Sequence, residues 1–533
     1  MKISGLLTAA GVLYTTALAY PSKVGTLDLL EASAKDVSEA LARGKVTSLD
    51  LVKAYMERIE ANNHKGLHLN AVIETAPVAK VQDLAKSLDK ERAAGKVRSP
   101  LHGVPILVKD NYNTDPSLGM DTTAGSFVLY YAGGQAKGDA FVIKKLRDAG
   151  AIILGKSSLH VWSGFSGNPS SAWSPRGGQV SSPYVKGGFK AGGDPGGSSS
   201  GSGAGVSAGF VPLALGTDTE GSILGPSSRG ALYGLRPSIG TTSRTGVVPI
   251  SSSSDTTGPL GKTTWDVAAT LSIMAGLDPE DPDTRPAEVF RQKDYTKFLN
   301  TNGFKGLRIG VVRDPFFQDK TTKRDELTIK AFDKALVKMA ALGANVMEVS
   351  LDRPQDWNYT FTGSPNRTND AIILTQYDFK TDISNYLKDH RKNSTITDLG
   401  GIINTAVEHF AQEYPETCCF PTFVAADQLG DKATSGAYWL GKNFYNQLYE
   451  EGPVALYREH QLDLLVLPSE YGAARFGPVG RQPVGSVPLG YDEIGLPFGM
   501  AFVGKRYDEG TVIRAMSAYE AHFPKRKVPS LLK

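Results

Sequence analysis

The sequence predicts an α/β protein with a mostly parallel or mixed β-sheet. Short apolar runs of strand length alternate with segments whose apolar residues recur at helical spacing, which is typical of this fold class. Of the 533 residues, 41% are hydrophobic, so the chain can form a large core. Large α/β sheets can take this many residues in one domain, and no internal repeat is visible.

The predicted helices have their apolar residues on one side, and the predicted strands are apolar throughout, as in strands buried on both faces. In chain order, we predict helices over residues 37–41 and 48–59, a strand over 104–108, a helix over 139–149, and strands over 151–154, 307–312 and 462–467. Ser48 is a suitable N-cap for the second helix. We expect the polar segment from about 280 to 430 to be irregular and to form a variable cap over the site.

Residues 196–226 place two serine-containing loops around one short helix and one short strand. The small residues 200–209 fit a helix about 15 Å long, and residues 211–215 fit a strand about 16 Å long. Because the lengths match, the chain returns to the edge it left, and Ser198 and Ser222 can meet at the carboxyl edge of the sheet. These two serine hydroxyls beside glycine-rich backbone indicate a serine nucleophile next to backbone N–H groups that can act as hydrogen-bond donors.

Lys109 is the candidate base for this nucleophile, because no histidine falls in a glycine-rich loop. It ends the apolar strand 104–108, so it would lie at the same sheet edge as the serines. A lysine accepts a proton only when neutral, and burial can lower the pKa of its ammonium enough for that. The alternation of side chains along a strand would point the neighbouring Asp110 to the opposite face.

Three other interpretations of these motifs fit less well. Residues 150–157 match the phosphate-binding pattern GxxxxGK[ST], but the middle residues are apolar and strand-like, whereas that loop must curl around a phosphate. Residues 197–201 match the GxSxG nucleophile elbow with Ser199 as nucleophile, but no apolar strand precedes them. A flexible linker is disfavoured because an apolar strand follows directly.

Charge and cysteine content exclude several classes of protein. The net charge is only +3 and the charges are interspersed, which argues against nucleic acid as a partner. The two cysteines, Cys418 and Cys419, are neighbours, so their Cα atoms lie about 3.8 Å apart, below the roughly 4.4 Å limit of ordinary disulfides. No Cys/His spacing typical of a zinc site occurs, and we expect no metal.

The N-terminus resembles a secretory signal peptide over residues 1–19. Lys2 supplies the positive start, residues 3–18 are mostly apolar, and residues 17–19 form a small-x-small cleavage site. An N-terminal anchor is the alternative, although the apolar part is short for a membrane span. Secretion agrees with three candidate glycosylation sites, at Asn358, Asn366 and Asn393.

Taken together, these motifs resemble the amidase signature family, the Ser–cis-Ser–Lys amide hydrolases, and its secreted fungal and plant-type subgroup. The resemblance covers residues 20–533, with core motifs over 100–265 and 460–505. The matching motifs are GVPILVKD from Gly103, TTAGS from Thr122, LRDAGAIILGK from Leu146, GGQ from Gly177, the stretch 196–226, GVVPI from Gly246, DTTGP from Asp255, VPLG from Val487 and GLPFG from Gly495.

The resemblance implies a single large domain in which helices enclose a mixed, mostly parallel sheet. It assigns Lys109 as the catalytic lysine, Ser198 as the bridging serine on a cis peptide and Ser222 as the nucleophile. The backbone N–H groups of Thr219, Glu220 and Gly221, with that of Ser222, would form the oxyanion hole.

The chain departs from the commonest family pattern at four positions. Glu220 stands where glycine or alanine is usual, Leu224 where arginine is usual, and Ser158 and Val161 where asparagine and glutamate are usual. An acidic residue before Gly–Ser resembles the fungal and plant subgroup, so it does not imply inactivation. It would place negative charge near the scissile bond.

The function implied is that of a secreted amidase that hydrolyses the C–N bond of a small-molecule amide through a serine acyl-enzyme. No cofactor, nucleic-acid partner or stable membrane insertion is expected. A catalytically inactive amidase-fold binding protein is one alternative. A glutaminase-type amidotransferase subunit is another, and the signal peptide argues against it. Neither the acyl and amine specificity nor the oligomeric state is predicted.

Overall fold

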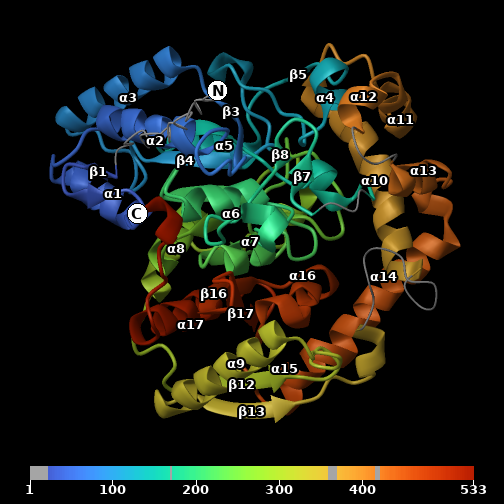
Figure 1. Ribbon diagram of the computed structural model, residues 1–533. Coiled ribbons are helices and arrows are strands. Elements are labelled where there is room, and N and C mark those ends of the chain that lie inside the picture. Colours follow the sequence, from blue (N-terminus) through green and yellow to red (C-terminus); the bar gives the residue numbers. More distant parts are fainter. Residues whose placement is uncertain (1–21, 168–170, 358–368, 415–419) are drawn as a thin grey trace, which may run out of the picture.

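The computed structural model describes residues 22–533 apart from 168–170, 358–368 and 415–419, and its centre is one eleven-stranded sheet (Figure 1). The strand order across the sheet is β13-β12-β15-β17-β16-β10-β11-β9-β4-β6-β3. The strands are β3 (Val72–Thr75), β4 (Pro105–Lys109), β6 (Ile152–Ser157), β9 (Leu213–Asp218), β10 (Tyr233–Arg236), β11 (Thr256–Gly261), β12 (Arg308–Val312), β13 (Asn345–Val349), β15 (Leu464–Pro468), β16 (Val484–Tyr491) and β17 (Pro497–Gly504).

The predicted α/β class and the mixed sheet between helices are confirmed. β4 pairs in parallel with β6 and β9, and β12 pairs in parallel with β13 and β15. The other neighbouring strands are antiparallel, so parallel pairing is confined to two blocks and antiparallel pairing is more extensive than the sequence indicated. One reason is the short connection between β16 and β17, which allows only an antiparallel pair.

Helices cover both faces of the sheet and extend beyond one side of it (Figure 1). They are α1 (Ala34–Ala42), α2 (Ser48–Asn62), α3 (Val78–Ala93), α4 (Phe127–Tyr131), α5 (Phe141–Asp148), α6 (Ser200–Ser207), α7 (Leu224–Arg229), α8 (Thr264–Met274), α9 (Lys323–Ala341), α10 (Asn369–His390), α11 (Leu399–Glu408), α12 (Phe410–Glu413), α13 (Pro421–Asp427), α14 (Gly436–Tyr449), α15 (Ala455–Glu459), α16 (Ala474–Gly480) and α17 (Glu509–His522). Among the described residues, no helix combines the length and apolarity needed to cross a membrane.

The segment 280–430 differs from the irregular cap expected from its polarity. Residues 308–349 form β12, α9 and β13, and the two strands extend the central sheet at one end. They form regular structure because apolar strands flank an amphipathic helix whose buried residues include Phe332, Leu336 and Met339. The long helix α10 follows and lies with α14 along one side of the molecule (Figure 1).

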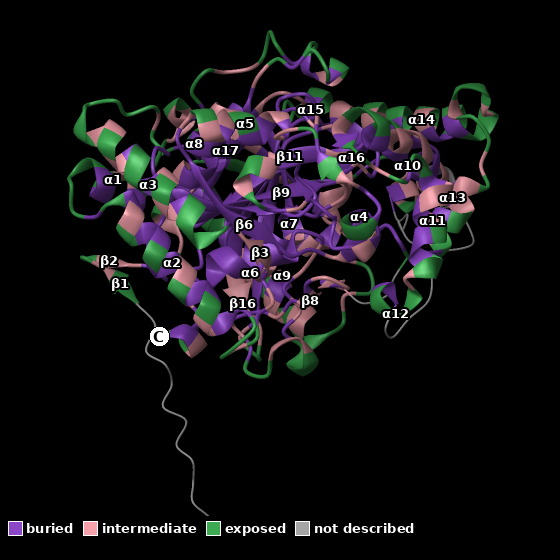
Figure 2. Cartoon of the chain, turned by 90° about the horizontal axis from the view of Figure 1, so that it is seen from above, coloured by how far each residue is buried: buried purple, intermediate pink, exposed green. Residues whose placement is uncertain are grey.

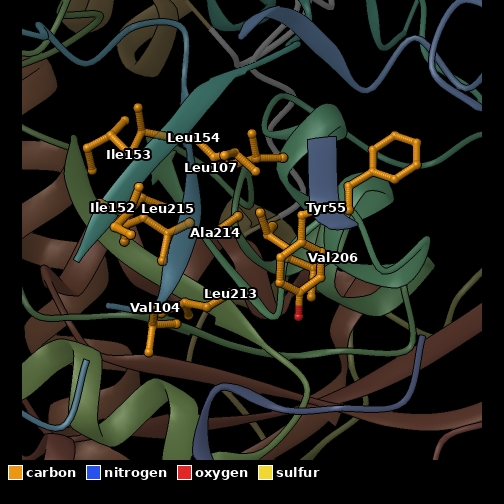
Figure 3. Packing of buried hydrophobic residues seen from close by; sticks show 14 of the residues in the cluster. Tyr55, Val104, Leu107, Ile152, Ile153, Leu154, Val206, Leu213, Ala214 and Leu215 are labelled. Carbon is orange, nitrogen blue, oxygen red and sulfur yellow. The ribbon is translucent and has the colours of Figure 1, made fainter. Parts of the chain in front are cut away.

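The core beside the serine loops is apolar and closely packed (Figure 3). Leu107 of β4, Ile153 of β6 and Leu215 of β9 belong to one buried cluster, together with Val206 of α6 and Tyr55 of α2. Figure 2 shows the same division for the whole molecule, with buried residues at the centre and exposed ones at the periphery. Close packing of this cluster therefore fixes the positions of the ends of β4 and β9.

Candidate active site

Lys109 is the last residue of β4 and its side chain is fully buried. The Nζ atom donates hydrogen bonds to Ser198 Oγ at 2.7 Å and to Thr217 Oγ1 at 2.8 Å. Burial lowers the pKa of Lys109 to about 7, although the carboxylates of Asp218 and Asp255 act against this shift. The lysine can therefore be neutral near pH 7, as a general base must be.

Asp110 faces away from this amine, as strand alternation predicts. One of its carboxylate oxygens accepts hydrogen bonds from the Thr123 hydroxyl and from the Gly125 N–H. The other lies 3.8 Å from the Nζ atom of Lys156. Asp110 therefore belongs to a separate buried polar cluster on the opposite face of β4.

Ser198 lies in the glycine-rich loop that leads into α6, and the Gly197–Ser198 peptide bond is cis. The residue is only 3% exposed, and its carbonyl accepts a hydrogen bond of 3.0 Å from the His160 N–H. α6 lies so close to the sheet that a Cβ at Gly201 would overlap Ala71 O and Ser158 N. The small residues of α6 allow this approach.

Ser222 lies in the loop that follows β9, and it is 8% exposed. Its carbonyl accepts a hydrogen bond of 3.2 Å from the Ser199 N–H, so the two serine loops lie directly against each other. Gly221 has φ +86°, a conformation that glycine adopts without strain, and a Cβ there would lie 2.8 Å from that of Ala474. The structure thus brings Lys109, Ser198 and the Ser222 loop together at one sheet edge.

The predicted oxyanion hole needs a correction at one position. The Gly221 N–H donates to Asp218 Oδ1 at 2.8 Å, so it is already satisfied, and the Ile223 N–H donates to Asp218 Oδ2 at 2.7 Å. Arg236 in turn holds Asp218 Oδ1 at 2.7 Å, and both side chains are fully buried. The backbone N–H groups of Thr219, Glu220 and Ser222 form no hydrogen bond with another described residue.

The residues that depart from the family pattern have identifiable surroundings. The Glu220 carboxylate lies 4.0 Å from Arg475 Nε, and burial raises the pKa of Glu220 to about 7. Leu224 and Val161 are both buried in apolar clusters. The Ser158 hydroxyl is buried without a hydrogen-bond partner among the described residues.

Neither the phosphate-binding pattern nor the nucleophile elbow has the surroundings that its function requires. Lys156 is buried in β6, where its Nζ donates to Thr122 Oγ1 at 2.9 Å and to the Tyr112 carbonyl, and the backbone before it pairs within the sheet instead of curling around an anion. Ser199, the nucleophile of the elbow interpretation, is fully buried, and its hydroxyl donates to the Thr217 carbonyl at 3.1 Å.

Several sequence predictions fall outside the described residues. These are the signal peptide over 1–19, the sequons at Asn358 and Asn366, and the cysteine pair at 418–419. Asn393 is described and exposed at the surface, as a glycosylation site would be.

A cavity of about 570 Å³ is lined by Thr217, the hydrogen-bond partner of Lys109, whereas Lys109, Ser198 and Ser222 themselves do not line it. Its inner wall includes Thr217 and Asn111, and the Asn111 amide donates to Thr217 Oγ1 at 2.9 Å. Thr219 of the nucleophile loop and Ser163 also line it, and α10 forms its outer wall. This cavity is the candidate substrate pocket.

Sequence reasoning missed Thr217, Asn111, Asp218 and Arg236. Asn111 lies two residues after the end of β4, and Asp218 is the last residue of β9. These positions at the ends of strands could have marked both residues as candidate site residues. Arg236 gave no such signal, because the pairing of β10 within the sheet, on which its position depends, is not evident from the sequence.

Comparison with known proteins identifies the family of this chain. The family model described as Amidase matches residues 50–476. A putative amidase of Arthroderma benhamiae is 34% identical over 530 residues, which covers 92% of this chain and 85% of that protein. A probable amidase of Arabidopsis thaliana is 35% identical over 515 residues, covering 95% of this chain and 93% of that protein.

Among solved structures, the native peptide amidase from Stenotrophomonas maltophilia is similar, with a TM-score of 0.83 and 34% sequence identity. The alignment covers 94% of this chain and 99% of that one. Sequence and fold therefore agree over nearly the whole length, and the cis-serine, lysine and glycine-rich loops lie within the matched region. The chain belongs to the amidase family and is an amide hydrolase.

Proposed function

We propose that this amide hydrolase cleaves carboxylic amides, peptide amides among them, through an acyl-enzyme on Ser222. The observation that carries this proposal is the 2.7 Å hydrogen bond between Lys109 Nζ and Ser198 Oγ, directly beside the Ser222 loop. The similarity to a peptide amidase supports peptide amides as substrates.

In the proposed mechanism, neutral Lys109 accepts the hydroxyl proton of Ser198 while Ser198 accepts that of Ser222. The Ser222 oxygen attacks the amide carbon, and the carbonyl oxygen becomes an oxyanion. The C–N bond then breaks, and the proton returns through Ser198 to the leaving nitrogen. Water, deprotonated by the same relay, hydrolyses the ester and releases the carboxylic acid and free Ser222.

Backbone N–H groups of the nucleophile loop stabilise the oxyanion in this proposal. Thr219, Glu220 and Ser222 supply them, and Asp218 fixes the loop through the N–H groups on either side of Ser222. A single donor of this kind contributes roughly 2.7–4 kcal/mol in comparable hydrolases, so the shape of the loop matters as much as the nucleophile.

The test is ammonia release from a series of peptide amides and small aliphatic or aryl amides. Ser222→Ala should lower kcat by at least about a thousandfold without loss of fold. The matched control is Ser200→Ala, which removes a buried hydroxyl without a hydrogen-bond partner among the described residues. Full turnover by the Ser222→Ala protein would contradict the mechanism.

The same assay separates the two alternatives. Ammonia release by the isolated chain, with no partner subunit present, argues against an obligate amidotransferase subunit. A folded protein that hydrolyses no amide and reacts with no serine-directed probe would instead be an amidase-fold binding protein, since a fold alone does not guarantee activity.

We also propose that the protein is secreted. The support is the pattern of residues 1–19, with its Lys2 start and small-x-small cleavage site, and the exposed sequon at Asn393. N-terminal sequencing of protein recovered from culture medium should begin at Tyr20. Intact Met1 on protein that stays with the cells would contradict secretion.

A further inference from the structure

The candidate substrate pocket is lined by more acidic than basic side chains. Its carboxylates are Asp255, Glu280, Asp281, Asp283, Asp382 and Asp389. Its cations are Arg244, Lys442 and Arg481. The wall therefore carries excess negative charge, and its distribution decides what the pocket could bind.

The two arginines are already neutralised by neighbouring carboxylates. Arg244 forms ion pairs with Asp281 at 2.7 Å and with Asp283 at 2.6 Å, and Arg481 pairs with Asp283. Asp382 shares Lys432 with the buried Asp378. These groups neutralise one another. Lys442, the third cation of the lining, forms no ion pair with a described residue; its amine donates to Ser253 Oγ at 3.1 Å, and burial lowers its pKa.

Three carboxylates of the pocket have no cation partner among the described residues; Asp255 is buried and accepts hydrogen bonds from Thr219, Ile250 and Ser251, and the other two are exposed. Glu280 and Asp389 are exposed, and neither forms an ion pair with a described residue. His390 lies beside them, but burial lowers its pKa, so the imidazole is neutral at pH 7. Lys137 is also near His390, but its amine donates to the Lys388 carbonyl at 2.9 Å and it does not line the pocket.

The inner wall provides a second, independent observation. Asn111 is 2% exposed, and its Oδ1 atom is buried without a hydrogen-bond partner among the described residues. Its amide nitrogen donates to Thr217 Oγ1, which also accepts a hydrogen bond from Lys109 Nζ, so the free oxygen lies on the wall that carries a hydrogen-bond partner of the lysine. Thr256 lines the same pocket, and its Oγ1 atom is also buried without a hydrogen-bond partner among the described residues. An unpaired buried acceptor favours a ligand that brings an N–H donor.

We propose that this pocket selects amides that carry an ammonium or guanidinium group, such as peptide amides with a lysine or arginine side chain. The cation is held by Glu280 and Asp389 at the exposed end, and Asn111 Oδ1 accepts an N–H from the ligand at the inner end. The proposal rests on the proposed function, because it assigns a substrate class to the same site.

The test compares acetylated dipeptide amides that differ only in lysine, methionine or glutamate. Ammonia release should give a kcat/KM for the lysine amide about five- to tenfold above that for the methionine amide at low salt, with the glutamate amide lowest. Added salt should reduce this ratio, because exposed charges are screened. The double variant Glu280→Gln, Asp389→Asn should bring the ratio close to one.

The matched control is Glu57→Gln, which removes an exposed carboxylate on α2 outside the pocket and should leave the ratio unchanged. A ratio that stays the same in the double variant, with methionine amide still hydrolysed, would overturn the proposal. So would a preference for the glutamate amide.

If no amide is hydrolysed, calorimetric binding of the same amides to the Ser222→Ala protein still decides the question. If the lysine amide binds more tightly than the other two amides, and this difference disappears once Glu280→Gln and Asp389→Asn are added, the pocket assignment is supported although the proposed reaction fails. Equal binding of all three amides would reject the pocket assignment.

Discussion

The pH dependence of Ser222 reactivity should reveal the titration of Lys109. With its pKa lowered by burial to about 7, the lysine is neutral in half of the molecules at pH 7 and in about one tenth at pH 6. An unperturbed lysine of pKa 10.5 would be neutral in only about one molecule in three thousand at pH 7. Because only the neutral form accepts a proton, reactivity should rise about tenfold per pH unit below pH 6 and level off above about pH 8.

The assay is the second-order rate constant for labelling by a fluorophosphonate between pH 5 and pH 10, which requires no knowledge of the substrate. Glu220 also has a pKa raised to about 7, so it must be separated from Lys109. The Glu220→Gln protein should keep the same midpoint, since the titrating base is intact. A rate that still rises tenfold per unit above pH 9 would refute the neutral-lysine account, and so would a midpoint that disappears with Glu220.

Two further predictions concern the support of the nucleophile loop. Asp218→Asn should cost about 3–5 kcal/mol of unfolding free energy in urea, because it leaves the buried Arg236 without its carboxylate partner; a loss below 1 kcal/mol would contradict this. Gly201→Ala should prevent folding or remove activity, because its Cβ would overlap the backbone atoms Ala71 O and Ser158 N. Gly138→Ala, where no atom lies within 4 Å of the added Cβ, should have almost no effect on thermal stability, and equal melting temperatures for both variants would refute the packing argument.

The parts of the fold that could be predicted from the sequence are those with strong local signals. The helix found as α2 begins at Ser48, but the N-cap prediction for Ser48 is wrong, because Thr47 caps the helix by accepting a hydrogen bond from the Asp50 N–H. β4 ends at Lys109 because the apolar run ends there. The predicted strand 211–215 is β9, which begins two residues later and extends to Asp218. These elements are fixed by apolar periodicity and by capping residues, which are properties of neighbouring residues.

Long-range pairing and polar networks could not be predicted in the same way. The antiparallel middle of the sheet depends on contacts between strands far apart in the chain, such as β10 with β16. The strand predicted over 307–312 is β12, but the charge of residues 280–430 concealed α9 and β13, because an amphipathic helix with a charged outer face looks polar on average. The loss of Gly221 from the oxyanion hole follows from one hydrogen bond to Asp218, which no spacing rule reveals.

The central claim is that Ser222 is an activated nucleophile served by Lys109 through Ser198. Peptide mapping after treatment of the folded protein with a fluorophosphonate tests it most directly. The account predicts a single adduct on Ser222 in the wild-type protein and almost none in the Lys109→Ala protein. An adduct on Ser199, or equal labelling of Ser222 after Lys109→Ala, would contradict it.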